Sequence, residues 1–344
     1  MTRNLHTNFS TDARRFSVNY VFLSMLLVTL FILDLVSGAV FIPLQKVLSI
    51  FSDHPDPSAD LIVVGIRLPK AIVAICAGAG LSVAGLLMQT FYRNPLAGPF
   101  VLGVNSMASL FVALFIAGGM SEFSLLHALG LPLSAFTGAM AGLLLLLALS
   151  VKVKDSTQML LMGMMLGFLA GALESLVAFS ANAQQLKSFV VWGMASFSAT
   201  GELSDVLVFA IVIAGTCTLA LLFTKSLNLL LAGEDQAKLL GVHVRRFKIL
   251  LLIAVALLSG TVTAYCGPVG FIGLAIPHLV RIWFRTTHHF HQIMGSILTG
   301  GCFALFCDFV GNLPIFDMTL PVNVITSLFG APFVFWMIFS KKQI

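Results

Sequence analysis

Long apolar runs, separated by short polar or glycine- and proline-containing breaks, fill most of the chain. A helix needs about 20 mainly apolar residues to cross the hydrocarbon core of a bilayer, and most of these runs are of about that length. Because helices satisfy their own backbone groups in lipid, the pattern predicts an all-α polytopic membrane protein. The ten predicted spans are residues 18–41, 61–91, 99–118, 125–151, 159–181, 189–223, 247–265, 270–284, 292–311 and 320–340.

Three kinds of span depart from the simple pattern. The third and eighth are short and flanked by Gly and Pro. The sixth is long, and its polar start, Trp192 to Asp205, is expected to lie along the membrane surface before the span proper. The apolar run from Val18 to Val36 is too long for the core of a signal peptide, so we predict a retained first span after an N-terminal segment, residues 1–17.

The longest mixed polar stretch lies between the two apolar halves, at residues 228–248, and is called the central segment below. Glu234 and Asp235 can occupy the first turn of a short helix, where they complement its dipole. Glu234 and Lys238 are four residues apart, in the favourable order for an ion pair on one helix face. Gly241 can supply the left-handed residue that ends this helix, and the residues after it can begin a second one. The pattern suits docking to a soluble partner; an ordinary solvated loop is the alternative.

Composition supports the membrane assignment. Hydrophobic residues make up 58% of the chain and charged residues only 10%, against roughly 25% charged in a soluble domain. No region is polar enough to fold as a separate soluble domain, so residues 1–344 are predicted to form one transmembrane domain. The net charge of +5 comes from scattered basic residues, which argues against nucleic acid as a partner. The five cysteines match no zinc or redox motif.

The basic residues also predict orientation. With ten spans and a cytoplasmic amino end, most Lys and Arg residues fall on the side that holds both termini and the central segment. The opposite side holds only Lys46, Arg67, Lys70 and Lys187. Because Lys and Arg accumulate in cytoplasmic loops, both termini are predicted to be cytoplasmic.

Two Gly- and Pro-rich breaks lie at corresponding places in the two halves. They are residues 94–103 (NPLAGPFVLG), after the second span, and residues 267–273 (GPVGFIG), after the seventh. The predicted topology puts them on opposite sides of the membrane. This is typical of an inverted repeat, which here would relate spans two to five to spans seven to ten.

Small residues recur at the spacing of a helix face. Gly163, Gly167 and Gly171 share one face of the fifth span, and Gly138 and Gly142 share one of the fourth. Such faces allow close approach of helices, either within one subunit, which we favour, or between two copies.

Five motifs, in order along the chain, match one known family. They are RLPK (67–70), RNPLAGPFVLGVN (93–105), LNLLLAGEDQAKLLGV (227–242), GPVGFIGLAIPHLVR (267–281) and LPVNVITSLFGAP (320–332). In these motifs the chain resembles the FecCD family, the vitamin B12 and ferric-siderophore permeases of ABC importers. Two positions depart from the family pattern. Asn323 stands where the family often has Gly, and Asn312 stands where some members carry an Arg that holds the binding protein.

The resemblance implies a ten-helix subunit of a bacterial inner or plasma membrane that pairs with a second copy. Two cytoplasmic ATP-binding subunits would drive it, and an external binding protein would deliver the metal chelate. The chain has no G-x-x-x-x-G-K-[ST] phosphate loop, so ATP is expected on a separate polypeptide and no cofactor in this chain. The resemblance places the central segment in a groove of the ATPase, with Glu234, Asp235, Lys238, Leu239, Leu240 and Gly241 as the coupling residues.

The same resemblance gives a docking role to Arg67 and Lys70, which would face acidic residues of the binding protein. The alternative is that both side chains extend to lipid headgroups. No nucleophile–base set or paired carboxylates appear in the sequence, so no catalytic site is predicted.

Candidates for the translocation path are Glu174, Gly167, Gly171 and Asn323. Glu174 and Asp308 are ionisable residues inside apolar spans, where such residues usually face a cavity or a partner. A proton-coupled secondary carrier would also use such a group, so this function remains the alternative. Asp34 is predicted to be interfacial. His288, His289 and His291 lack further ligands and are predicted to form a solvated loop rather than a metal site.

The sequence thus predicts the permease of an ABC importer for a metal chelate. A ferric siderophore is the first choice of substrate, with haem or cobalamin as alternatives. A membrane scaffold or intramembrane enzyme is a third class, and the lack of catalytic groups argues against it.

Overall fold

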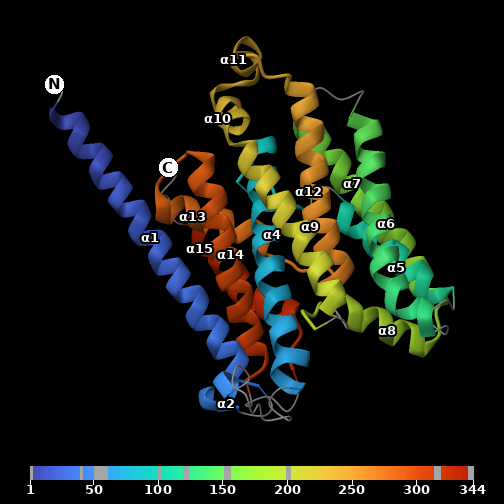
Figure 1. Ribbon diagram of the computed structural model, residues 1–344. Coiled ribbons are helices and arrows are strands. Elements are labelled where there is room, and N and C mark those ends of the chain that lie inside the picture. The colour runs from blue at the N-terminus through green and yellow to red at the C-terminus, as the bar shows by residue number, and fades with distance from the viewer. Residues whose placement is uncertain are drawn as a thin grey trace.

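The computed structural model describes residues 3–38, 42–49, 61–95, 97–99, 103–118, 124–150, 156–198, 203–313 and 319–339. Every regular element among these residues is a helix (Figure 1). In chain order they are α1 (Arg3–Val36), α2 (Leu44–Ser49), the π-helical turn η1 (Val63–Arg67), α4 (Leu68–Tyr92), α5 (Val104–Ala117), α6 (Ser124–Ser150), α7 (Ser156–Ser180), α8 (Ala183–Gly193), α9 (Leu203–Leu222), α10 (Thr224–Ala232), α11 (Glu234–Leu239), α12 (Val244–Cys266), α13 (Ile272–Phe284), α14 (His289–Gly311) and α15 (Val322–Phe339).

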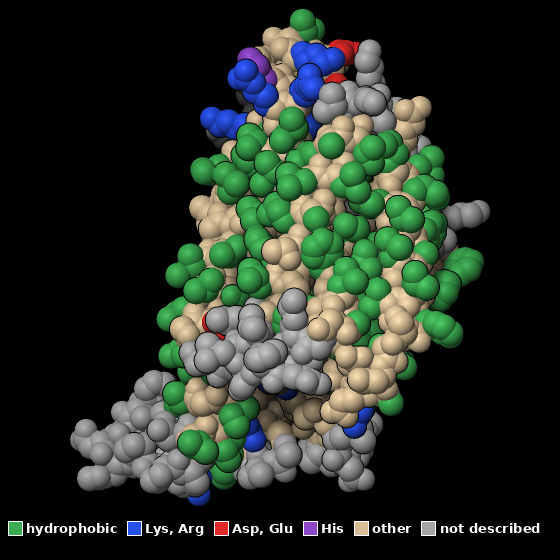
Figure 2. Space-filling model, turned by 90° about the vertical axis from the view of Figure 1, so that its right-hand side faces the viewer, with side chains coloured by type: hydrophobic (Ala, Val, Ile, Leu, Met, Phe, Trp, Pro, Cys, Tyr) green, Lys and Arg blue, Asp and Glu red, His purple; other side chains and the backbone are tan. Residues whose placement is uncertain are grey.

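The helices confirm the predicted all-α membrane fold. Among the described residues, 7 helices are long and apolar enough to cross a membrane, and three shorter apolar helices lie in α5, α13 and α15. Together they coincide with the ten predicted spans, and α5 and α13 are short, as expected. Figure 2 shows a broad band of hydrophobic side chains across the middle of one face, with most Lys, Arg and His side chains gathered at one end and a few Lys or Arg side chains at the other. A lipid-embedded protein has this distribution.

The sixth predicted stretch, 189–223, divides into a first part and the span α9, as expected from its polar start, but the first part belongs to a separate helix, α8. The amphipathic helix α8 starts earlier than predicted, and the chain leaves the helical conformation before α9 begins at Leu203. Asn182 caps α8, because its side chain accepts from the backbone N–H of Gln185 while Gln185 bonds back to Asn182. This helix lies across the bundle at the end opposite α11 (Figure 1).

Helix α4 forms the centre of the bundle, where it packs against α9, α12, α13 and α14. Small residues allow this packing. A Cβ on Gly78 would lie 2.1 Å from the Gly300 carbonyl oxygen, and one on Gly85 would lie 1.6 Å from the Gly273 carbonyl oxygen. The backbones of α4, α13 and α14 are therefore in direct contact, which only glycine permits at these points.

The central helix of each half packs against corresponding helices of the other half, as expected of an inverted repeat. Helix α4 packs on α13 and α14, and α12 packs on their counterparts α5 and α6. Within the first half α5 packs on α6 and α7, and within the second α13 packs on α14 and α15. Spans two to five thus correspond to spans seven to ten.

The two Gly- and Pro-rich breaks meet inside the bundle. The first follows Arg93, which ends α4 with φ 48°, and reaches α5 at Gly103, with φ 69°. The second runs from Gly267 to Phe271. Phe271 has φ 63° and directly precedes α13. The ring of Pro99 lies against Gly273. The described residues of both breaks therefore pack against protein, where non-helical backbone at membrane depth is tolerated.

Candidate functional site

The central segment folds as a helix, a glycine, a second short helix and the start of α12. Helix α10 ends before Gly233, α11 follows with Glu234 and Asp235 in its first turn, and α12 begins at Val244. The carboxylates therefore lie at the helix end that favours negative charge. This confirms the predicted pattern of two helices about Gly241.

Glycines mark both ends of α11. Gly233 has φ 125° and ψ 151°, a region that is essentially restricted to glycine. Gly241 has φ 87°; its N–H donates to the Lys238 carbonyl, and the N–H of Val242 donates to the Ala237 carbonyl. This pair of bonds is the Schellman arrangement that closes a helix with a left-handed residue. The predicted role of Gly241 as the left-handed end of α11 is confirmed.

The ion pairs of α11 differ from the prediction. Lys238 pairs with Asp235 at 3.0 Å, and Glu234 pairs instead with Lys248 of α12 at 2.6 Å. The predicted Glu234–Lys238 pair is wrong because α12 folds back beside the start of α11 and supplies a nearer cation. Hydrogen bonding to Asp235, followed by the charge of that carboxylate, raises the pKa of Lys238. Since this pair is exposed to solvent, it stabilises the fold little.

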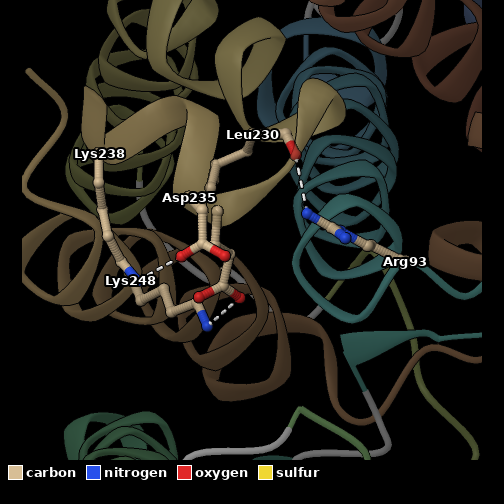
Figure 3. Close-up of polar contacts among 6 residues, drawn as sticks. Arg93, Leu230, Asp235, Lys238 and Lys248 are labelled. Atoms are coloured by element: carbon tan, nitrogen blue, oxygen red, sulfur yellow. Dashed lines mark hydrogen bonds and ion pairs between the residues drawn. The ribbon is translucent and has the colours of Figure 1, made fainter. Parts of the chain in front are cut away.

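Hydrogen bonds with residues of α4 and α14 fix α10 to the ends of these central membrane helices. Arg93, at the end of α4, donates to the Leu230 carbonyl at 3.0 Å (Figure 3). The Asn228 side chain accepts from the backbone N–H of His289 at 3.0 Å, and its Oδ1 lies 2.8 Å from the His289 ring. The same ring contacts the Thr90 hydroxyl of α4 at 3.0 Å. Any displacement of α10 is therefore passed to α4 and α14.

The tip of this assembly carries exposed apolar side chains. Leu239 is 87% exposed, Leu240 64% and Leu231 53%. Beside them lies an open hollow of about 430 Å³, lined by Lys238, Gly241, Val242, His243, Val244, Arg245 and Arg246. Leucines left in water on a rigidly attached tip are typical of a surface that a protein partner covers.

Three residues of this site, namely Arg93, Asn228 and His289, were not predicted from the sequence. Arg93 and Asn228 lie in the family motifs, but their partners come from other helices and leave no local signal. His289 is buried, and the His291 ring is in hydrogen-bonding contact with the Tyr20 hydroxyl at 2.8 Å, so the solvated-loop prediction is wrong for these two of the three histidines. Among the described residues, no group of three or more His, Cys, Asp or Glu side chains could hold a metal ion.

Arg67 and Lys70 lie at the opposite end of the bundle, and both are engaged within the chain. The Arg67 guanidinium donates to the carbonyls of Leu35 and Val36, at 2.7 and 3.0 Å; both carbonyls lie in the last turn of α1, where they have no partner within the helix. The Lys70 ammonium pairs with Asp308 at 3.0 Å and donates to Asn312 at 2.8 Å. These contacts supply a structural role for both cations, and the docking role stays a prediction.

The intramembrane carboxylates have different surroundings. Asp308 is buried beside Lys70, and Asp34, near the end of α1, is also buried within the protein; its interfacial position stays a prediction. Glu174 is half-buried on α7, where its carboxyl contacts the Ser109 hydroxyl of α5. The tertiary structure thus brings Asp34, Lys70 and Asp308 together and leaves Glu174 elsewhere.

Gly167 and Gly171, two glycines predicted to line the translocation path, differ in how closely other residues pack against them. A Cβ on Gly167 would meet Ser106 and Gly103 of the first break at 3.4 and 3.6 Å, whereas Gly171 has nothing within 4 Å. A Cβ on Gly138 would meet α5 at Met107, Phe111 and Ala108. The fourth-span glycines and Gly167 therefore serve packing within the subunit, while Gly171 lies on an open part of α7.

Asn323 joins three segments at the end opposite α11. Its Nδ2 donates to the carbonyls of Gly193 and Pro268, at 3.1 and 2.6 Å, and its Oδ1 accepts from the Gly270 N–H at 2.9 Å. It lies in the first turn of α15 and is not among the described residues with positive φ. The local turn therefore does not require the glycine that the family often has here, and the side chain holds the second break in place.

Replacing Asn323 by leucine should destabilise the fold by about 2–3 kcal/mol, because three neutral hydrogen bonds are lost at roughly 1 kcal/mol each. The measurement is the denaturation midpoint of the purified protein in detergent. Val324→Ala, at an exposed neighbouring side chain, is the matched control and should change little. A midpoint for Asn323→Leu equal to that of the control would show that the second break does not depend on this side chain.

Comparison with known proteins gives concordant matches. A model of the FecCD transport family matches residues 26–340. The hemin transport system permease protein HmuU of Yersinia pestis is 36% identical over 279 residues, which cover 81% of this chain and 83% of that protein. A probable iron chelatin transport system permease protein of Helicobacter pylori is 34% identical over 288 residues, covering 83% and 85%. A solved structure described as an inward-facing conformation of a metal-chelate type ABC transporter superposes with a TM-score of 0.82 at 28% identity, covering 94% of this chain and 99% of that one.

Proposed function

The chain belongs to the FecCD transport family, whose members are the membrane permeases of ABC importers, and we propose that it carries a ferric siderophore into the cytoplasm. In this proposal α11 docks on a cytoplasmic ATP-binding subunit, and a binding protein delivers the chelate at the opposite face. Both termini are cytoplasmic, and the protein lies in the inner or plasma membrane of a bacterium.

The coupling role is supported by one observation: the exposed leucines at the end of α11 follow a helix, α10, that is fixed to the membrane helices by hydrogen bonds. Leu239 and Leu240 are largely exposed, and α10 is tied to α4 and α14 by Arg93 and Asn228. A rigid element of this kind can pass ATPase closure to the membrane helices as a body, without bending.

A second copy of the chain completes the proposed importer. Helix α7 leaves Met165, Phe168, Leu169 and Leu176 exposed along its length, and Gly171 lies open on the same helix. We assign this face to the partner copy and to the path between the two copies. Glu174, which points at α5, lies beside this path rather than in a closed proton site.

The choice of substrate rests on the relatives. One similar permease is named for hemin and another for an iron chelatin, and both names describe iron chelates. A ferric siderophore fits this shared chemistry, and haem and cobalamin are the alternatives that the test must separate.

The test is uptake into proteoliposomes that contain the permease with its ATP-binding subunits and the binding protein. Ferric siderophores, haem and cobalamin are offered separately. ATP is supplied on the side of the membrane that carries the ATP-binding subunits, and no proton gradient is applied. We expect ATP-dependent uptake of a ferric siderophore, and the variant Glu174→Gln should transport equally well. Uptake driven by a proton gradient without the ATPase, and lost in Glu174→Gln, would instead establish a proton-coupled carrier.

A further inference from the structure

The open hollow beside the exposed leucines of α11 has a basic lining, and it is called the basic hollow below. Its volume is about 430 Å³, and its cationic lining residues are Lys238 of α11 and Arg245 and Arg246 of α12. Helix α11 lies at the very end of the molecule (Figure 1), and the Lys, Arg and His side chains gathered at that end lie beyond the hydrophobic band (Figure 2). The basic hollow is therefore within reach of a soluble partner, and the leucines alone do not account for its charge.

The chain itself does not neutralise the charge of the basic hollow. Both carboxylates of α11 are already engaged, one with Lys238 and the other with Lys248 of α12. Among the described residues, Arg245 and Arg246 form no ion pair, and both side chains are exposed. Two neighbouring guanidinium groups are thus free to bind an anion from outside this chain.

The position of these two arginines does not stabilise α12. They are its second and third residues, and the start of a helix carries partial positive charge, which disfavours cations. The first turn has no acidic residue, and the N-cap His243 supplies no side-chain hydrogen bond. Basic residues near the end of a span help to set its orientation, but orientation does not require them to line a hollow. A local arrangement that costs stability is typical of a functional surface.

Apolar side chains adjoin the basic hollow. Leu239 and Leu240 directly follow Lys238 in the chain, and both are largely exposed. An apolar centre beside arginines and a polar rim is the usual composition of a protein–protein interface. Because α11 extends beyond the ends of the membrane helices (Figure 1), a partner that covers both the leucines and the arginines is a protein rather than the bilayer.

We propose that the basic hollow receives an acidic segment of the ATP-binding subunit, whose Asp or Glu side chains pair with Arg245 and Arg246. This inference rests on the proposed function and adds the chemistry of the partner surface. Guanidinium groups suit the role, because each can bind a carboxylate through two parallel N–H···O bonds. The leucines supply the apolar contact that holds the complex, whereas the arginines attract and orient the subunit before contact.

The test is the rate at which the purified permease, in nanodiscs of zwitterionic lipid, associates with its ATP-binding subunit at low and at high salt. In the double variant Arg245→Glu/Arg246→Glu, association at low salt should be slower by about tenfold or more, because attraction becomes repulsion. Salt should speed association of this variant and slow that of the unmodified protein, since it screens both interactions. The variant should melt no lower than the unmodified protein, because glutamate is favoured at the start of a helix. Slower association at an unchanged melting temperature excludes misfolding as its cause.

Two control variants separate the basic hollow from net charge. Lys225→Glu/Arg285→Glu makes the same change in net charge at exposed cations that do not line the basic hollow, and it should change association little. Arg245→Lys/Arg246→Lys keeps the charge and should retain most of the association rate and its salt dependence.

Three results would overturn the proposal. The first is an unchanged rate and salt dependence in Arg245→Glu/Arg246→Glu; the proposed function then stands, provided that the unmodified permease binds the subunit. The second is equal slowing in Lys225→Glu/Arg285→Glu, which would assign the effect to net charge. The third is slowing that occurs only in nanodiscs with anionic lipid, which would make lipid headgroups the occupant. A permease that binds no ATP-binding subunit under any of these conditions would instead contradict the proposed function itself.

Discussion

Replacing Leu239 by aspartate should abolish ATP-driven transport while the membrane bundle still folds. Leu239 is 87% exposed and contributes nothing to the core, so folding does not depend on it. At the proposed interface, the aspartate would place an unpaired charge in an apolar contact. Loss of such a central contact costs about 2 kcal/mol or more, roughly thirtyfold in affinity. The measurement is ATPase stimulation by loaded binding protein, together with uptake, in reconstituted complexes.

Leu239→Met keeps an apolar side chain of similar size and should retain both activities. Gly241→Val supplies an independent variant of the same element. A Cβ at Gly241 has nothing within 4 Å, so no side chain collides with it. The φ of 87° nevertheless strains any β-branched residue by about 1 kcal/mol or more, which misplaces α11. Normal uptake and normal stimulation in both Leu239→Asp and Gly241→Val would show that the central segment is an ordinary loop.

Replacing Gly85 by alanine should produce the largest loss of stability in the membrane bundle. The added Cβ would lie 1.6 Å from the carbonyl oxygen of Gly273, and 2.8 Å from its Cα. Because the obstacle is backbone, α4 and α13 must move apart, and overpacking of this kind costs about 3 kcal/mol or more. The shift also displaces Pro99, which packs on Gly273, so the first break should be disturbed together with the second. The measurement is the denaturation midpoint of the purified protein.

Gly215→Ala is the matched control for this substitution. Gly215 lies inside α9, and a Cβ there meets nothing within 4 Å. The same chemical change at this position should be neutral, or stabilise by about 0.5–1 kcal/mol through helix propensity. Equal midpoints for the two variants would mean that the backbones of α4 and α13 are not in contact at Gly85.

Local patterns were enough to predict the helices and the form of the central segment. Span positions follow from runs of apolar residues, because a helix in lipid needs a minimum length and satisfies its own backbone. The ends of α11 follow from Gly233 and Gly241, since their φ values are accessible to glycine at little cost. The helix α8 was not predicted, because it begins at Ala183, before the sixth predicted stretch, and a hydropathy pattern alone does not give the ends of an amphipathic surface helix.

The partners of the charged side chains were decided by the tertiary structure alone. Lys70 binds Asn312, 242 positions away in the chain, and Arg67 binds carbonyls at the end of α1. Glu234 forms its ion pair with Lys248 and not with Lys238, because α12 lies beside the start of α11. Sequence spacing gives a residue's place on its own helix, whereas its partner depends on which helices pack together and at what height. The apolar pattern and the glycines therefore determined the helices of this permease, and helix packing determined which charges meet, including the Lys70–Asp308 pair.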